Sequence, residues 1–231
     1  MLNRQQHDVY LKQILRKIGR NDELNNQLIL KGGTCLYLFY DLPRFSVDLD
    51  FNLKLNSSFN PQILTEVLEK ELTIDDRREK HFTWFWLGSY QKGSQKIKIE
   101  VSKRNFPDEY EIKSFYGLSI NTLAPAYLFA HKLCAIEDRD RLQNRDLYDA
   151  HFMFEKNFDI NEDIITLRMN KTLVEYLDDL LVFIKDEVNS STILSGLGEL
   201  LNESQKNWVK HHLLSELPFQ IQLRKEVEEK K

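Results

Sequence analysis

Hydrophobic and polar residues change their spacing about halfway along the chain. In the first half, helical runs are interspersed with short stretches that have the composition or alternation of a strand. A helical run covers residues 9–18 and ends at Gly19, and another covers residues 60–72 with Pro61 in its first turn. The strand-like stretches are residues 27–30, 46–53, 81–87, 95–103 and 116–120, with a hairpin turn predicted at residues 91–94.

From Ala124 onward, every patterned segment predicts a helix. We therefore expect an α+β protein, in which a small mixed sheet with helices occupies residues 1–122 and an all-helical region occupies residues 123–231. The predicted helices of this second region are residues 125–138, 145–156, 172–188 and 203–223, and Pro218 is expected to kink or break the last.

Composition and charge exclude several classes of protein. The chain has 231 residues, enough to bury a core, and its net charge of -4 argues against a protein that coats nucleic acid through basic residues. The N-terminus lacks the apolar run of a signal peptide, and no stretch has the roughly 18 apolar residues of a membrane span, so we expect a cytoplasmic protein that has no membrane partner. Cys35 and Cys134 lack zinc-site spacing and are expected to be buried thiols.

Two acidic residues share one face of the second strand-like stretch. Side chains alternate across a strand, so Ser46, Asp48 and Asp50 point to one side and the apolar residues between them to the other. The two carboxylates would lie roughly 7 Å apart, and a divalent cation such as Mg²⁺ or Mn²⁺ would offset their repulsion. Glu100 has the same place in the fourth stretch and would complete a two-metal site if the strands are adjacent. The alternative is that these acids simply face solvent.

A glycine pair stands between the first strand-like stretch and a helical run. Gly32 and Gly33 precede Thr34, which opens a helix that ends before Pro43. Glycines let backbone N–H groups approach a phosphate, and a helix N-terminus favours its negative charge. We expect Thr34 to cap this helix or to donate its hydroxyl to a phosphate. A tight turn without a ligand is the alternative, but the order strand, glycine pair, helix and acidic strand favours a phosphate site.

Several of these motifs together resemble one protein family. The run KGGTCLYLFYDLPRFSVDLDFNL, residues 31–53, resembles the nucleotidyltransferase toxins of the AbiEii/AbiGii type, in which a GGT turn is followed by an arginine, a serine and a D-L-D-F strand. Residues 124–154 resemble the family's two C-terminal motifs, a helix with a lysine and then an arginine, and an R-D-x-x-D run. The run KIEVSKR, residues 98–104, fits the strand of the third acid more loosely.

The resemblance implies a DNA-polymerase-β-like nucleotidyltransferase core followed by a helical C-terminal region. It also implies Mg²⁺-dependent transfer of a nucleotide from an NTP to an acceptor. In characterised relatives the acceptor is the 3′ end of tRNA, and such proteins act as toxins of toxin–antitoxin or phage-defence systems, with an antitoxin encoded by a neighbouring gene. The same chemistry with a small-molecule or protein acceptor, and a non-catalytic nucleotide-binding module, are the alternatives.

The family pattern assigns roles to individual residues of this chain. Asp48, Asp50 and Glu100 are expected to be catalytic and to hold the metal ions. The residues expected to bind the nucleotide are Gly32, Gly33, Thr34, Arg44, Ser46, Lys132 and Arg139. For Arg44, an ion pair with Asp41 is an equally good expectation.

Lys132 lies on an otherwise apolar face of its predicted helix, four residues from Leu128 and from Ile136. We expect it to emerge beside the triphosphate and take part in catalysis, the alternative being a surface lysine with an extended stem. Asp146 and Asp149 share one side of the next helix and are expected to be catalytic by orienting Lys132 or binding nucleotide. For Asp146, offsetting the helix dipole is the alternative.

Overall fold

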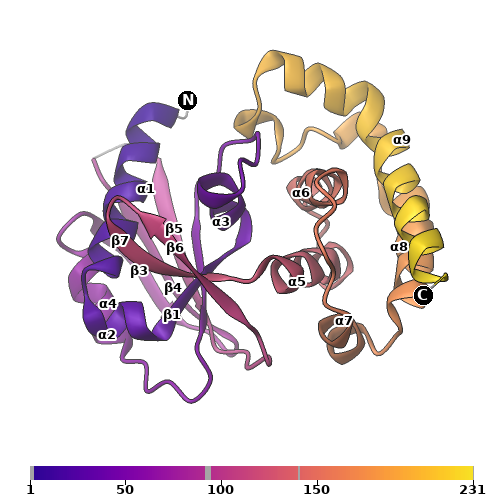
Figure 1. Ribbon diagram of the computed structural model, residues 1–231. Helices are drawn as coiled ribbons and strands as arrows, with labels where there is room; N and C mark the ends of the chain where they lie inside the picture. The colour runs from indigo at the N-terminus through magenta and orange to yellow at the C-terminus, as the bar shows by residue number, and fades with distance from the viewer. Residues whose placement is uncertain (1–2, 92–94, 140, 231) are drawn as a thin grey trace. The chain divides into compact units, whose positions relative to one another are not determined.

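The computed structural model describes residues 3–91, 95–139 and 141–230 and divides the chain into two compact units, whose helices and strands are labelled in Figure 1. The first unit contains Met1–Asp41 and Phe45–Ala124, and the second contains Leu42–Arg44 and Pro125–Lys231. The short segment Leu42–Arg44 therefore packs with the second unit although it interrupts the sequence of the first. No helix in the described ranges is long and apolar enough to cross a membrane.

A seven-stranded mixed sheet forms the core of the first unit, with the strand order β3-β4-β5-β2-β1-β7-β6. β1 is parallel to β7 and β2 is parallel to β5, while the other neighbouring strands are antiparallel. The predicted α+β class and mixed sheet are therefore confirmed. The strands are β1 (Leu28–Lys31), β2 (Leu49–Leu53), β3 (Thr73–Glu79), β4 (Thr83–Ser89), β5 (Lys96–Ser102), β6 (Tyr110–Phe115) and β7 (Leu118–Leu123).

The alternation of apolar and polar residues decides which side chains of β2 and β5 reach the core. In β5, three apolar residues are fully buried, and Lys98 and Glu100 between them are only partly buried. In β2, Leu49 and Phe51 are buried in the same way, and Asp50 between them is partly exposed. Acidic and basic side chains of the two parallel strands therefore share one face of the sheet.

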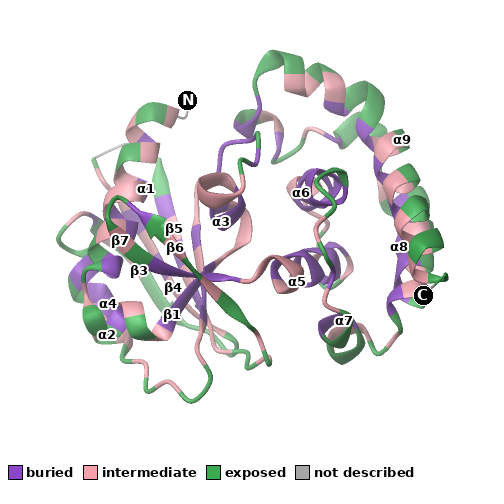
Figure 2. Cartoon of the chain, viewed as in Figure 1, coloured by how far each residue is buried: buried purple, intermediate pink, exposed green. Residues whose placement is uncertain are grey.

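Three of the four helices described in the first unit are stabilised by asparagine caps. Asn3, Asn21 and Asn60 each accept a backbone N–H from the first turn of the helix that follows. The longest of these helices packs against α2, α4 and β7 through an apolar stripe that Figure 2 shows as buried. The helices are α1 (Arg4–Gly19), α2 (Asp22–Gln27), α3 (Gly32–Phe39) and α4 (Pro61–Leu68).

The second unit is helical in its described part and is organised around one buried helix. All residues from Asp146 to Phe154 of α6 are buried, and this helix packs against α5 and α9. Helix α8 begins with a capping box at Thr172 and packs against α9. The helices are α5 (Pro125–Glu137), α6 (Asn144–Glu155), α7 (Glu162–Met169), α8 (Leu173–Glu187) and α9 (Glu203–Glu228), with short 3₁₀ helices η1 (Ser190–Thr192) and η2 (Gly198–Leu200).

Several predicted boundaries are wrong. β3, β6, α2 and α7 were not predicted, because the two strands are rich in polar residues and the two helices are short. The helix that Pro218 was expected to kink or break is not broken there, and residues on both sides of the proline are buried along one stripe of α9. Of the predicted hairpin turn at residues 91–94, the last three residues lie outside the described ranges, although β4 and β5 do pair as antiparallel neighbours.

Candidate functional site

Two of the three acids predicted to hold the metal ions are neighbours across the sheet. Asp50 of β2 and Glu100 of β5 are Cα partners in the parallel register. Asp48 is not on the strand as predicted, because β2 begins only at Leu49. The alternation expected from Ser46 onward therefore fails, and Ser46 is buried with 6% of its surface exposed.

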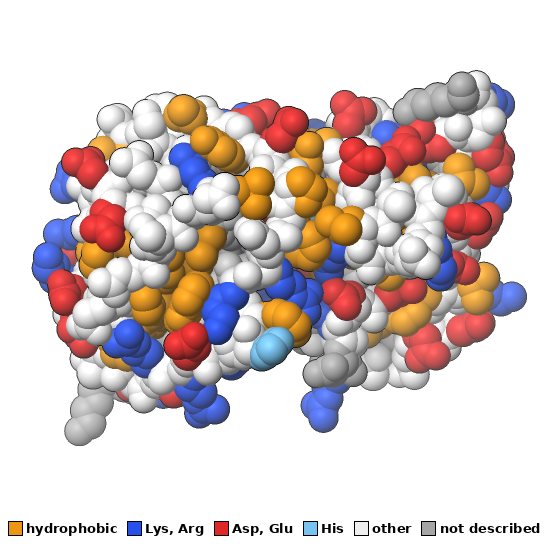
Figure 3. All heavy atoms as spheres, turned by 90° about the horizontal axis from the view of Figure 1, so that it is seen from below, with side chains coloured by type: hydrophobic (Ala, Val, Ile, Leu, Met, Phe, Trp, Pro, Cys, Tyr) orange, Lys and Arg blue, Asp and Glu red, His pale blue; other side chains and the backbone are white. Residues whose placement is uncertain are grey.

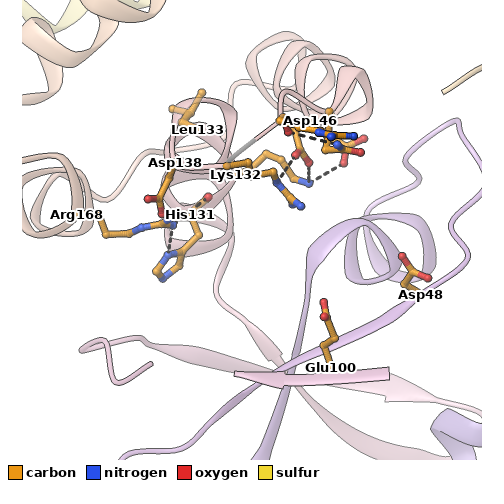
Figure 4. Close-up of polar contacts among 12 residues, drawn as sticks. Asp48, Glu100, His131, Lys132, Leu133, Asp138, Asp146 and Arg168 are labelled. Carbon is orange, nitrogen blue, oxygen red and sulfur yellow. Dashed lines mark hydrogen bonds and ion pairs between the residues drawn. The ribbon is translucent and has the colours of Figure 1, made fainter. Parts of the chain in front are cut away.

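A lysine that was not assigned a role lies between the acids. The Nζ atom of Lys98 is 3.2 Å from a carboxylate oxygen of Glu100 and 3.4 Å from one of Asp48. Lys80 approaches the other oxygen of Glu100 at 3.9 Å. Figure 4 labels Asp48 and Glu100. Within the described ranges, no three His, Cys, Asp or Glu side chains converge as a ready-made metal site, and the repulsion between these acids is offset by a protein cation.

Gly32 brings the backbone of the glycine turn directly against Asp50. Its φ angle of 73° lies in the left-handed region, and a Cβ atom there would be 2.8 Å from a carboxylate oxygen of Asp50. Gly32 and Gly33 are the first two residues of α3. The turn and the acidic strand, which the sequence predicted separately, are therefore in contact, and any residue other than glycine would be strained at position 32.

The segment before β2 is fixed by side chains rather than by strand pairing. Thr34 is buried, and its hydroxyl contacts the Ser46 hydroxyl at 2.8 Å and the backbone carbonyl of Asp48. Thr34 does not cap α3, because the N-cap position is occupied by Lys31. Burial lowers the pKa of His7, so the neutral ring donates its Nε2–H to the carbonyl of Val47 at 2.9 Å.

The predicted functional residues of the second unit form a buried ion cluster. Arg44 donates two hydrogen bonds to Asp149, at 2.6 and 2.7 Å, so its main partner is not the anticipated Asp41. Lys132 lies 2.8 Å from Asp146 and 2.9 Å from Asp149, so it contacts both acids that were expected to orient it or to bind nucleotide. Figure 4 shows Lys132 of α5 directed toward Asp146 of α6.

Charge pairing keeps Asp149 and Lys132 ionised despite their burial. Burial by itself would raise the pKa of Asp149, but Arg44 and Lys132 outweigh it and hold that pKa below its usual value. Burial would likewise lower the pKa of Lys132, and Asp146 and Asp149 raise it instead. Lys132 is only 8% exposed, and its ammonium group lies between these two carboxylates.

Arg139 completes the cluster from its outer side. Its guanidinium Nε lies 2.9 Å from the second carboxylate oxygen of Asp146, and its side chain is 41% exposed. Asp146 itself is in the first turn of α6 and fully buried, so an effect on the helix dipole and an ion pair with Lys132 operate together.

Three contributors to these clusters escaped the sequence reasoning. Lys98 had a detectable signal, because it occupies the same face of its strand as Glu100, two residues away. His7 carried no local signal, since it contacts a carbonyl 40 residues further along the chain. The pairing of Arg44 with Asp149 spans 105 residues and could not be inferred from the spacing of either motif.

Comparison with known proteins identifies the family. Residues 13–211 match the family model of the nucleotidyl transferase AbiEii toxin of type IV toxin–antitoxin systems. A crystal structure from H. pylori, provisionally assigned as a nucleotidyltransferase, is 23% identical with a TM-score of 0.65 and covers 97% of this chain and 96% of its own. JHP933 from Helicobacter pylori is 22% identical with a TM-score of 0.62, and the corresponding coverages are 100% and 96%.

The two structural relatives establish a shared fold, and no curated protein matches the sequence. The family match extends over most of the 231 residues and includes both charged clusters. The chain therefore belongs to the nucleotidyltransferase AbiEii toxin family and is a nucleotidyltransferase toxin.

Proposed function

We propose that this nucleotidyltransferase uses an NTP and divalent cations to transfer a nucleotide to the 3′ end of tRNA. The observation that carries the proposal is the contact between three elements of the first unit. Asp50 and Glu100 are register partners on β2 and β5, and the backbone of Gly32 lies against Asp50. Carboxylates beside a glycine turn at a helix start form the arrangement that metal-dependent phosphoryl transfer requires.

The residues present suit Mg²⁺ or Mn²⁺. Asp48, Asp50 and Glu100 offer carboxylate oxygens, the ligands that these ions prefer. Asp48 and Glu100 already share the ammonium group of Lys98, so they lie within reach of one common cation. A bound divalent cation would supply charge neutralisation at the α-phosphate and at the departing pyrophosphate.

Groups of the protein would bind the triphosphate and activate the acceptor. The backbone N–H groups of Gly32 and Gly33 open α3 and would hold the triphosphate. Glu100 would orient the attacking hydroxyl and accept its proton. Lys132 and Arg139 are expected to contact phosphate, with their side chains directed by the buried aspartates of α6.

The acceptor is proposed from the family resemblance and is compatible with the charge of the chain. The net charge of -4 favours a compact acceptor over a long nucleic acid. On the face seen in Figure 3, basic and acidic side chains are interspersed, so that face has no continuous basic stripe. A neighbouring gene would encode the antitoxin that the toxin family implies. A protein or small-molecule acceptor would use the same site.

The test is transfer of label from each of the four α-labelled NTPs in the presence of Mg²⁺, with total RNA or a protein extract as acceptor. We expect label in a tRNA-sized band, loss of transfer in Asp50→Asn, and retention in Asp76→Asn. Asp76 is a matched control because it lies on edge strand β3 and pairs only with charges of that strand in the described contacts. Label in a protein band would show that the acceptor is a protein and not tRNA. The absence of any transfer with Mg²⁺ or Mn²⁺ would refute the proposal.

Expression in cells gives a second readout. Growth inhibition should disappear in Asp50→Asn and persist in Asp76→Asn, with both variants folded as judged by circular dichroism. Toxicity that survives Asp50→Asn would show that nucleotidyl transfer is not its cause.

A further inference from the structure

The two edges of the seven-stranded sheet differ in how they are protected. Edge strand β3 carries five consecutive charged residues, 75–79, and its pairing with β4 shifts register between Ile74 and Asp76. Both features discourage another strand from adding to that edge. Edge strand β6 has neither, and instead exposes Tyr110 by 43% and Ile112 by 68%. An edge with exposed apolar side chains is a site for strand addition.

The hydrogen-bond pattern of β6 shows which backbone groups face outward. The N–H of Ala124 donates to the carbonyl of Glu109, which fixes the register and phase of the antiparallel pair with β7. Hydrogen-bonded pairs recur at every second residue, so residues 111, 113 and 115 bond to β7. Tyr110, Ile112 and Ser114 therefore direct their N–H and C=O groups away from the sheet, and β6 pairs with β7 alone in the described ranges.

We propose that β6 pairs with β6 of a second copy of this chain, as antiparallel strands related by a two-fold axis at Ile112. Tyr110 then lies opposite Ser114 of the second copy, and Ile112 lies opposite its own counterpart. The outward N–H and C=O groups of these residues bond to those of the second copy, and each pair of opposite residues forms two hydrogen bonds. The two seven-stranded sheets become one continuous sheet across the interface.

The charges of β6 select this register over its neighbours. With the axis at Ile112, Glu111 of each copy faces Lys113 of the other, which is a favourable cross-strand pair. A shift of the pairing by two residues in either direction places Glu111 opposite Glu111 or Lys113 opposite Lys113, which is unfavourable. Within one copy the two side chains already pair at 2.7 Å and are 41% and 31% exposed, so they can engage a partner. This self-complementarity favours a second copy as the occupant.

The interface is small, because it centres on one six-residue strand. Interfaces below about 1,200 Å² belong to weak and transient complexes. The dimer should therefore appear with rising protein concentration and weaken with added salt, since its register depends on partly exposed charges.

Charge reversal gives a test that a folding defect cannot imitate. Sedimentation velocity of the wild-type chain should reveal a monomer–dimer equilibrium. Lys113→Glu and Glu111→Lys should each be monomeric, and an equimolar mixture of the two variants should recover the dimer, because opposite charges then face each other. Glu79→Lys, on the opposite edge strand, is the control and should dimerise like the wild type. A wild-type monomer at every concentration, or a mixture that fails to associate, overturns the proposal.

A cross-link locates the axis directly. Ile112→Cys would place two thiols on Cα atoms about 5.5 Å apart, within the range that a disulfide spans. Mild oxidation should yield a covalent dimer, with Val182→Cys as a control at another exposed apolar residue that should not cross-link. The native Cys35 and Cys134 are fully buried and give no background. Cross-linking of both variants alike, or of neither, would contradict a specific contact at Ile112.

Discussion

Replacing Asp149 tests the buried cluster of the second unit. Asp149 is fully buried, accepts two hydrogen bonds from Arg44 and lies 2.9 Å from Lys132. Removing one partner of a buried ion pair costs about 3–5 kcal/mol, because the remaining charge stays buried without compensation. In Asp149→Ala two cations lose this carboxylate at once. The cost is therefore a large share of the stability of many proteins, which is about 5–15 kcal/mol.

The measurement is thermal and urea unfolding followed by circular dichroism. For a protein of this size, about 2–4 °C of melting temperature corresponds to 1 kcal/mol, so Asp149→Ala should melt about 6–20 °C lower. Asp186→Ala is the matched control, because Asp186 is an exposed residue of α8 in the same unit. The double variant Arg44→Met with Asp149→Leu should recover much of the loss, since an apolar pair needs no compensation. Equal stability of Asp149→Ala and Asp186→Ala would refute the claim that the buried ion pairs of Asp149 stabilise the fold.

The same cluster predicts a pH dependence. The folded-state pKa of Asp149 is lowered, so its contribution to the free energy of unfolding is complete above about pH 4, the usual carboxyl range, and is lost as the pH falls through the lower folded value. The pKa of Lys132 is raised, so its contribution is present below its usual value of 10.5 and is lost as the pH rises above it. Urea titrations from pH 7 to pH 3 should show a flatter acid decline in Asp149→Ala than in the wild type.

Three further substitutions address the first unit. Gly32→Ala should destabilise the fold by about 1–3 kcal/mol, because it strains a left-handed residue and crowds Asp50, and urea unfolding would measure it. Lys98→Met should tighten Mn²⁺ binding in a paramagnetic resonance titration, since a competing cation is removed, and unchanged binding would contradict this. Thr34→Val should cost about 1–3 kcal/mol by removing the hydrogen-bond partner of the Ser46 hydroxyl and of the Asp48 carbonyl, whereas Thr34→Ser should cost less; equal unfolding curves would show that the hydroxyl at position 34 contributes nothing.

The sequence predicted those parts of the site that depend on residues close together in the chain. The two-residue period of β5 placed Glu100 on one face with Lys98, and the glycine pair marked the start of α3. Both features depend on residues within a few positions of one another, and a sequence displays such spacing directly.

Contacts between distant segments could not be predicted in this way. Asp48 follows the alternation of β2 in the sequence, yet it lies outside the strand because Thr34 and His7 bind the carbonyls of the preceding segment instead. Arg44 was expected to contact phosphate or Asp41, and its actual partner lies on a helix 105 residues away. Edge strand β3 was missed because charged residues, which disfavour strands in general, suit an unprotected edge.

The two charged clusters differ in how readily their cations can be exchanged. Lys98 is 27% exposed, and its ammonium lies 3.2–3.4 Å from the acids of the first unit, so water or another cation can replace it at small cost. Arg44 and Lys132 are 3% and 8% exposed and lie 2.6–2.9 Å from buried aspartates, so their displacement would leave charges without compensation. Exchangeable ions therefore suit Asp48 and Glu100, whereas Arg44 is better suited to holding segment Leu42–Arg44 in place than to binding a ligand.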